Sequence, residues 1–442
     1  MPDIAEKFGY PHCTGHRSSL AGGMYKGCQA EAAIKFHFST ALKAIESFGP
    51  KPKITLQPRD GDAYTREVDV LLGADGIKSI TRTTMLDKLG LVAEEADTGQ
   101  AAYRIMLNRS EIEDDDELLA LMDSDLVVRW IGERRHIIAY PVSNKTIYNL
   151  STAQPDDHFA AAPSATYTTR GSKAAMLGVF GDFCPLVQRM LNMVPEGEVC
   201  EWRLRQHKEL ATWVHGSVAL LGDACHPTLP HLSQGAAMAI EDGAVVAEVL
   251  SLARSTAPAA LRRCLRVYER LRKARTTTLV DLAAFSGRAL HLGEGKAKEE
   301  RDRQFAEHRD KKGAIPDKWA SPDVQAMIYS HDCVQHARDN FDELYEQIAN
   351  EEQEEEAEET LVEETPPAEE PPAEEEAAGP ASNGTAAVET LNGAANGASN
   401  GASNGASNGV KRKAEDDHET EENGITGVEN GLSQGKKVRI SA

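Results

Sequence analysis

A short apolar run that ends in Gly-Asp constrains the fold of this chain more than any other feature. Residues 218–221 read Val-Ala-Leu-Leu, and Gly222 and Asp223 follow them directly. Such a run is typical of a buried parallel strand, which delivers its next residues to the carboxyl edge of a sheet, where ligands bind. We therefore expect an α/β fold with Asp223 at a ligand-binding edge.

A proline-bracketed loop and a helix follow this strand. Pro227 and Pro230 exclude a helix from the loop, whereas the pattern of residues 233–250 is helical. Free backbone N–H groups and the positive end of the helix then face the same edge as Asp223. Gly235 lets the backbone approach a flat ligand closely, and a carboxylate accepts hydrogen bonds from hydroxyl groups. This arrangement suits the ribityl chain and the ring edge of a flavin.

The whole string is more specific than its parts, because a Gly-Asp turn alone occurs in many α/β proteins. Gly-Asp-x-x-His-x-x-x-Pro, followed by Gln-Gly-Ala and Glu-Asp, resembles the second flavin motif of class A FAD-dependent aromatic hydroxylases, especially salicylate hydroxylase-like monooxygenases. The resemblance implies that FAD is contacted by Gly222, Asp223, Pro230, Gln234, Gly235 and Ala236.

Two shorter motifs upstream extend the resemblance. Residues 69–82 read as another buried strand that enters a turn, and they are similar to the family's Asp-Gly motif, with Asp75, Gly76 and Arg82 in place. In the family this motif touches FAD and the pyrophosphate of the nicotinamide cofactor. Arg17, in His-Arg-Ser-Ser-Leu, resembles an arginine that contacts FAD at the start of a helix. Taken alone, Asp-Gly is most often an ordinary turn, and Arg17 is equally well a surface residue.

A third region resembles the substrate domain of the family. Residues 127–141 alternate and turn like a β-hairpin, and residues 145–153 continue as a strand. The resemblance implies that Tyr140 and Pro141 lie near the aromatic ring to be hydroxylated, and Arg104 belongs to a similar Tyr-Arg pair on a neighbouring strand. A tyrosine in an alternating strand is more often a packing residue.

The resemblance implies a reaction that uses FAD, NAD(P)H and O2. In the family, NAD(P)H reduces the flavin, and one atom of O2 enters a small electron-rich aromatic substrate, such as salicylate or a phenol. The cofactor carries this chemistry, which explains why no catalytic triad stands out. His226 and His231 lie on the loop expected to face the substrate, although each is alternatively a structural hydrogen-bonding residue. His231 replaces an aromatic residue of the salicylate-type pattern, which argues against salicylate itself.

One element of the family is missing from the sequence. These hydroxylases begin with a strand, Gly-x-Gly-x-x-Gly and a helix that holds the FAD pyrophosphate, whereas Gly22, Gly23 and Gly27 are spaced differently and follow no strand. Either the sequence is incomplete or the protein has lost the usual FAD binding, so we expect weak FAD binding and impaired hydroxylation. One alternative is a non-catalytic remnant that acts as an interaction protein through its acidic tail. A weaker one is a related flavoprotein, such as an epoxidase or halogenase.

The predicted architecture is an FAD-binding doubly wound domain without its first βαβ element, combined with an antiparallel substrate-binding sheet and a disordered C-terminal tail. Short strands are expected at 34–38, 42–46 and 53–57, with a hairpin turn at Asp60-Gly61, and residues 294–318 are expected to be a mobile excursion. The expected parts are a partial FAD-binding domain (1–100), a substrate-binding β-sheet domain (101–205), the second part of the FAD-binding domain with its helices (206–290), a helical C-terminal segment (291–350) and an acidic low-complexity tail (351–442).

Composition indicates a protein of the cytoplasm. Residues 351–442 hold 22 acidic and 6 basic residues, and they carry most of the net charge of −22 without a core-forming pattern. Lys411, Arg412 and Lys413 indicate nuclear import as an alternative. The seven cysteines are scattered, without Cys-x-x-Cys spacing, so neither disulfides nor a metal site is expected. Neither a membrane span nor a nucleic-acid partner is indicated.

Overall fold

The two strands that carry the flavin-like motifs pair side by side. The computed structural model describes residues 4–157, 168–309 and 315–364. One three-stranded sheet has the order β11-β12-β4 and consists of β4 (Leu71–Gly73), β11 (Val214–His215) and β12 (Val218–Leu220). β12 is buried and runs parallel to β4, with Val218 opposite Leu71 and Leu220 opposite Gly73. The predicted buried parallel strand is therefore confirmed.

A six-stranded antiparallel sheet lies between these two strands in the sequence. Its order is β6-β7-β8-β5-β10-β9, and its strands are β5 (Glu95–Asn108), β6 (Val128–Gly132), β7 (Arg135–Val142), β8 (Ile147–Pro155), β9 (Thr168–Arg170) and β10 (Cys200–His207). Buried side chains such as Tyr103 and Leu150 form a core with the helices α4 (Asp116–Asp123), α5 (Lys173–Val179) and α6 (Pro185–Met193). The predicted hairpin at 127–141 and the strand after it are confirmed as β6, β7 and β8.

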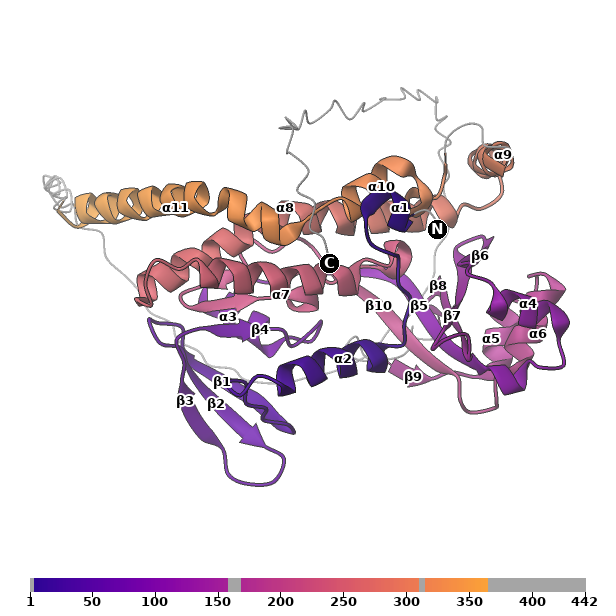
Figure 1. Ribbon diagram of the computed structural model, residues 1–442, viewed down its shortest axis with the longest axis horizontal. Coiled ribbons are helices and arrows are strands. Elements are labelled where there is room, and N and C mark those ends of the chain that lie inside the picture. Colours follow the sequence, from indigo (N-terminus) through magenta and orange to yellow (C-terminus); the bar gives the residue numbers. More distant parts are fainter. Residues whose placement is uncertain (1–3, 158–167, 310–314, 365–442) are drawn as a thin grey trace, which may run out of the picture. The chain divides into compact units, whose positions relative to one another are not determined.

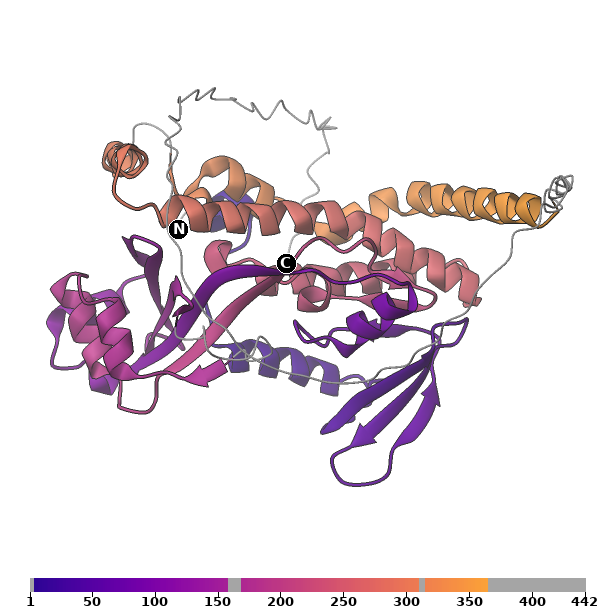
Figure 2. The same ribbon diagram turned by 180° about the vertical axis from the view of Figure 1, so that it is seen from behind.

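Long helices pack beside the parallel strands. They are α7 (Gly235–Ser251), α8 (Pro258–Leu290) and α11 (Cys333–Glu364), which contact one another, and the shorter α3 (Ile80–Lys88) follows β4. Figures 1 and 2 show α8 running along α7. Leu220 of β12, Val246 of α7, Tyr268 of α8 and Phe341 of α11 belong to one buried core. The helical patterns predicted after Ser233 and after Pro258 are thus confirmed.

The predicted strand at 34–38 is wrong. The third sheet consists of β1 (Thr40–Ser47), β2 (Lys53–Pro58) and β3 (Tyr64–Glu67), so the two later predicted strands are confirmed and the Asp-Gly turn joins β2 to β3. Phe36 and Phe38 instead stack with centroids 5.7 Å apart and pack edge-on against Tyr25 of α2 (Arg17–Gln29). Phe36 and Phe38 lie two positions apart, so an alternating pattern places both on one side and does not distinguish a strand from this aromatic cluster.

The charged segment at 294–318 contains a helix rather than only a mobile excursion. Its described part includes α9 (Lys296–Arg309), followed by α10 (Pro322–Tyr329). Arg303 forms ion pairs with Glu300 and Glu307, three and four residues away, which stabilises a helix of this composition. Arg301 is buried and donates a hydrogen bond of 2.9 Å to the carbonyl of Leu290. The spacing of opposite charges three and four residues apart therefore favours a helix in this segment, although its high charge content suggested a mobile excursion.

Helix α11 continues past the predicted start of the disordered tail at residue 351. Glu352 is buried and pairs with Arg263 at 2.6 Å, and Glu351 pairs with Arg266 at 3.3 Å. Both arginines belong to α8, so the first acidic residues of the predicted tail are ion-paired to the folded body. The tail boundary placed at residue 351 is therefore too early.

Residues 365–442, including Lys411, Arg412 and Lys413, lie outside the described residues. No helix in the described part of the chain is both long enough and apolar enough to cross a membrane.

Two buried histidines, His136 and His231, meet the partly buried His291 where β7 approaches the end of α8. Nδ1 of His136 lies 2.6 Å from Nε2 of His291, and the ring of His231 lies 5.4 and 5.5 Å from their rings. Burial, with a contribution from the positive charge of Arg129, lowers the pKa of all three, to about 3 for His231 and about 4 for His291. All three imidazoles are therefore neutral at pH 7.

A chain that ends at Asn350 should be less stable than one that ends at Glu364. The shorter chain lacks Glu351 and Glu352 and leaves arginines of α8 without their partners, which should cost about 1 to 2 kcal/mol for partly buried pairs. Thermal midpoints would measure the difference. The chain that ends at Glu364 is the control and should melt together with the full chain. Equal midpoints for the two truncations would contradict the ion pairing.

The three histidines should make the fold acid-sensitive. Their pKa is about 6.5 in the unfolded chain and lower in the folded one, so the unfolded state binds more protons between these values. The stabilisation associated with the neutral histidines should be complete above pH 6.5. Below that pH the free energy of unfolding should fall towards pH 4, by up to about 1.4 kcal/mol per pH unit for each histidine. Urea unfolding at pH 7, 6 and 5 measures this slope. His291→Gln should reduce it and replacement of the exposed His37 by Gln should not; an unchanged slope in His291→Gln would refute the assignment.

Candidate functional site

One pocket collects most of the residues predicted to contact flavin or substrate. It has a volume of about 760 Å³ and lies where β4 and β12 end. The predicted residues among its lining are Arg17, Gly76, Tyr140, Gly222, Asp223, Pro230, Gly235 and Ala236. They come from α2, from the turns after β4 and β12, from β7 and from the start of α7. Segments far apart in the sequence therefore build a single site.

Asp223 is the only acidic side chain among the residues that line this pocket. It sits in the 3-10 turn η3 (Gly222–Ala224), directly after β12. Its side chain is accessible from the pocket, yet the surrounding protein removes water from it and raises its pKa, against the opposing effect of His226 and Arg17. Such a carboxylate is well suited to accept hydrogen bonds from ligand hydroxyl groups.

Glycine residues form part of the pocket lining. Gly222 has φ +57°, and a Cβ there would lie 3.0 Å from the Cβ of Ala239. Gly76 has φ +78°, a conformation that side chains rarely adopt. Gly235 begins the 17-residue helix α7, whose free N–H groups and positive end are therefore at the pocket. This geometry admits a flat ligand close to the main chain.

Asp75 and Arg82 support the pocket without lining it. The Asp75 carboxylate accepts hydrogen bonds from Ser79 Oγ at 2.5 Å and from the amide and hydroxyl of Thr81 at 3.0 Å. Burial opposes ionisation of Asp75, but these hydrogen bonds outweigh it and lower the pKa. Arg82 is buried and donates from Nη1 to the carbonyl of Ala224 at 3.0 Å. Arg82 therefore ties the first motif to the second.

The structure turns His226 away from the pocket, contrary to the prediction. Its Nε2 lies 2.6 Å from Oδ2 of Asp242, and its ring lines a separate cavity of about 270 Å³ together with Trp213 and Cys225. The partner, Asp242, lies seven residues, about two turns, after the start of α7. The direction of the ring is therefore set by the buried carboxylate of the Glu-Asp pair in the same motif, a residue to which the sequence pattern assigned no role.

His231 is also buried instead of facing the substrate. It is 1% exposed, and its Nε2 lies 3.1 Å from Oε1 of Gln100 in β5. A Cβ on Gly287 of α8 would lie only 2.5 Å from its ring, so the ring fills a space that this glycine leaves. His231 thus packs the sheet against α8, beside His136 and His291.

The remaining predicted residues lie at the margin. Gln234 is the buried N-cap residue of α7, and its carbonyl accepts the hydrogen bond of Met238 N–H at 2.9 Å. Pro141 lines a different cavity of about 430 Å³, which shares Tyr140 with the main pocket. The carbonyl of Pro141 accepts a hydrogen bond from Thr14 Oγ1 at 3.2 Å. Neither residue lines the main pocket.

Arg104, which the sequence placed in a Tyr-Arg pair resembling that of the family, lines the pocket, and so does Ser151, which was not among the predicted site residues. Arg104 follows the fully buried Tyr103 in β5, so the alternation of the strand turns its guanidinium towards the opposite face. Loss of water lowers the pKa of Arg104, the nearby Tyr140 raises it, and the charge of Arg17 lowers it. The pocket therefore contains two arginines and one aspartate.

Comparison with known proteins identifies the family of the chain. The model of the FAD binding domain family matches residues 17–283. The chain is 32% identical over 268 residues to the FAD-dependent monooxygenase OpS4 of Beauveria bassiana, covering 60% of each chain. It is 27% identical over 286 residues to a 3-hydroxybenzoate 6-hydroxylase of Polaromonas naphthalenivorans, covering 65% of each chain. The chain thus spans less than two thirds of the length of these curated relatives.

Solved structures show the same fold. A salicylate hydroxylase–substrate complex superimposes with a TM-score of 0.56 at 23% identity, covering 73% of this chain and 74% of that one. CtdE in complex with FAD and a substrate gives a TM-score of 0.60 at 22% identity, covering 75% of each chain. The α/β FAD-binding fold expected from the sequence is confirmed. The chain therefore belongs to the FAD binding domain family, and its relatives in that family are FAD-dependent monooxygenases.

Proposed function

We propose that the 760 Å³ pocket binds the ring and ribityl portion of FAD, and that the protein uses NAD(P)H and O2 to hydroxylate a small aromatic substrate. The observation that carries the proposal is the convergence of Gly76, Gly222, Asp223 and Gly235 at the end of two parallel strands. These residues come from two separate motifs, so an incidental turn does not account for them. Relatives that hydroxylate 3-hydroxybenzoate support an aromatic substrate.

The residues present fit the cofactor. Asp223 offers an acceptor for hydroxyl groups, and the start of α7 offers N–H donors and positive potential for an electron-rich ring edge. The left-handed glycines leave room for a planar group against the main chain. The volume of the pocket lies within the range of small-molecule and cofactor sites.

FAD, when bound, supplies the oxygen chemistry of the reaction. The chain's own residues orient and shield the reacting groups. Tyr140 and Ile138 of β7 present ring and apolar surface to the pocket and help to exclude water, while Pro230 limits the motion of the loop beside it. The start of α7 stabilises negative charge through its N–H groups. Arg104 provides a cation for an anionic group on the substrate.

An aromatic carboxylate is the substrate class that this pocket favours. Arg17 and Arg104 together outnumber the single negative charge of Asp223, so the pocket attracts an anion. Arg104 is on the substrate-side sheet with Tyr140 and Ser151, and a planar guanidinium matches a carboxylate. The expectation of weak FAD binding without a glycine-rich dinucleotide element stays a prediction.

Asp223→Ala should weaken FAD binding about tenfold to a hundredfold. The change removes a charge-assisted hydrogen bond of about 1.5 to 3 kcal/mol. Quenching of flavin fluorescence during titration measures the dissociation constant. Asp62→Ala, at the exposed β2–β3 turn, is the matched control and should bind as the parent does. The same titration is repeated on a chain extended by the strand, glycine-rich turn and helix of a relative, which should bind more tightly. Equal affinity of Asp223→Ala and parent in both forms would remove Asp223 from the site.

Arg104→Met should raise the KM for 3-hydroxybenzoate about tenfold to a hundredfold, because one charged hydrogen bond is lost. The KM for an uncharged phenol should stay the same, because no carboxylate needs the guanidinium. Initial rates of NAD(P)H-dependent product formation by the extended chain measure both values. Arg59→Met, at an exposed position, is the control. A similar change for both substrates would refute carboxylate recognition by Arg104.

A further inference from the structure

We propose that His226, Asp242 and Arg272 form a buried clamp that positions the Gly222–Asp223 turn, and with it the carboxylate that faces the flavin. The inference rests on the proposed function of the pocket. It gives His226 a positioning role in place of the substrate contact expected from the sequence. Each part of the clamp comes from a different element: the loop after η3, helix α7 and helix α8.

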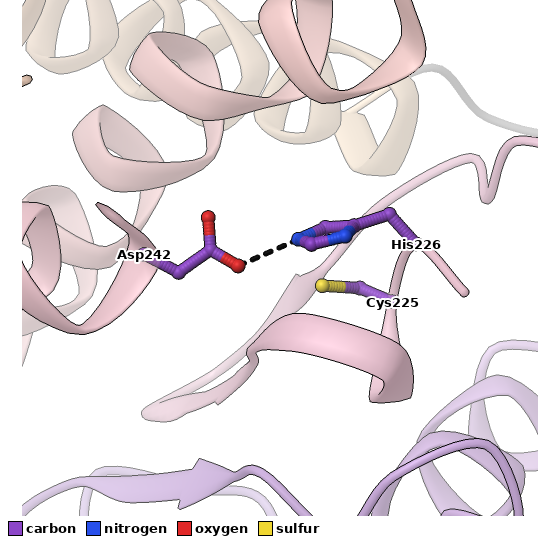
Figure 3. A group of neighbouring side chains, drawn as sticks. All are labelled: Cys225, His226 and Asp242. Atoms are coloured by element: carbon purple, nitrogen blue, oxygen red, sulfur yellow. Dashed lines mark hydrogen bonds and ion pairs between the residues drawn. The ribbon is translucent and has the colours of Figure 1, made fainter. Parts of the chain in front are cut away.

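Asp242 is the centre of the clamp, and both oxygens of its carboxylate have hydrogen-bond partners. The residue has no exposed surface. Its Oδ2 accepts hydrogen bonds from the amide of Gly222 at 2.9 Å and from Nε2 of His226 at 2.6 Å, the second of which is drawn in Figure 3. Its Oδ1 accepts a hydrogen bond from Nε of Arg272 at 2.9 Å. A buried carboxylate is tolerated only with such partners, so these contacts define one position for it.

Arg272 anchors the carboxylate to the long helix α8. The guanidinium is 1% exposed, and its Nη2 lies 2.6 Å from Oε2 of Glu241. Glu241 also accepts hydrogen bonds of 2.9 and 3.0 Å from Arg275. Burial opposes ionisation of Asp242, but His226 and Arg272 outweigh it and lower the pKa, so the centre of the clamp is charged. Oppositely charged side chains of α7 and α8 therefore hold the Asp242 carboxylate in place.

The clamp controls Asp223 because the backbone alone sets the place of that side chain. Asp242 holds the Gly222 amide at one end of the turn, and Arg82 holds the carbonyl of Ala224 at the other. Among the described residues, no hydrogen bond reaches the Asp223 carboxylate itself. A shift of the Gly222 peptide would therefore carry the Asp223 carboxylate with it.

The same residues do not favour a metal ion. Ligand atoms of Cys225, His226 and Asp242 lie within 4.8 Å of one another, as Figure 3 illustrates. Both oxygens of Asp242 are already engaged, and the positive charge of Arg272 is 2.9 Å away. Burial, followed by the negative charges of Asp242 and Asp223, raises the pKa of the Cys225 thiol well above its usual value, so it stays protonated. Hydrogen bonding explains the cluster without a cation.

Replacing His226 separates positioning from simple structural support. His226→Leu should weaken FAD binding about tenfold, whereas His226→Gln, whose amide donates from a position close to Nε2, should restore it to within about twofold. In an Asp223→Ala background, His226→Leu should cause no further loss of FAD affinity, because both changes act through one group. His207→Leu is the matched control, since His207 lines the same cavity without contacting Asp242. Additive losses in the double variant would overturn the clamp.

A second measurement does not depend on FAD. Hydrogen exchange of the Gly222 amide should become about tenfold faster in His226→Leu, while the Leu220 amide, which bonds to Trp213, should keep its rate. His226→Gln and His207→Leu should exchange like the parent. If no form of the chain binds FAD, the proposed function fails, and the exchange rates still decide the positioning role. An unchanged Gly222 rate in His226→Leu would overturn the inference.

Discussion

The parallel pairing of β4 with β12 is the constraint on which the candidate site depends. Three backbone positions on each strand are in register, so the Gly76 turn and the Gly222 turn leave the sheet at the same edge. Arg82 reinforces this pairing from the side by bonding the carbonyl of Ala224. If the register slipped by one residue, the two turns would no longer face one pocket. The flavin-like motifs have a common function only because this pairing brings them together.

Charged side chains differ between the two sides of the Gly222–Asp223 turn. The front of the turn faces the pocket, and its back packs against α7 and α8. Behind the turn, Asp242 and Arg272 are almost fully buried and neutralise each other. In front, Asp223 and Arg104 face the pocket and have no ion-pair partner of that kind among the described residues. The buried charges hold the turn in one position, and the charges that face the pocket are available to a ligand. A rigid support with unpaired groups in front of it is the arrangement that a binding site requires.

Local sequence patterns predicted the strands and helices better than the directions of side chains. The apolar run of β12 and the helical pattern of α7 depend on neighbouring residues, and both predictions are confirmed. The ring of His226 turns towards Asp242, 16 residues further on, and that of His231 towards Gln100, 131 residues away. Asp242 belongs to the same motif as His226, but a sequence pattern does not show which of its side chains pair, and Gln100 lies outside the pattern around His231. Arg104 was noted in the sequence as part of a Tyr-Arg pair, and the alternation of β5 beside the buried Tyr103 is consistent with its place in the pocket lining.

The insertion of the six-stranded sheet between β4 and β12 has a kinetic consequence. Arg82 and Ala224, which meet beneath the pocket, are 142 residues apart in the sequence. Contacts between such distant residues cost loop-closure entropy and form slowly, and each of the two paired strands has only three residues. We therefore expect the pocket to be assembled late in folding, after the intervening sheet. A ligand bound there would stabilise the folded state by mass action, so the supply of that ligand would set how much of the newly made chain survives.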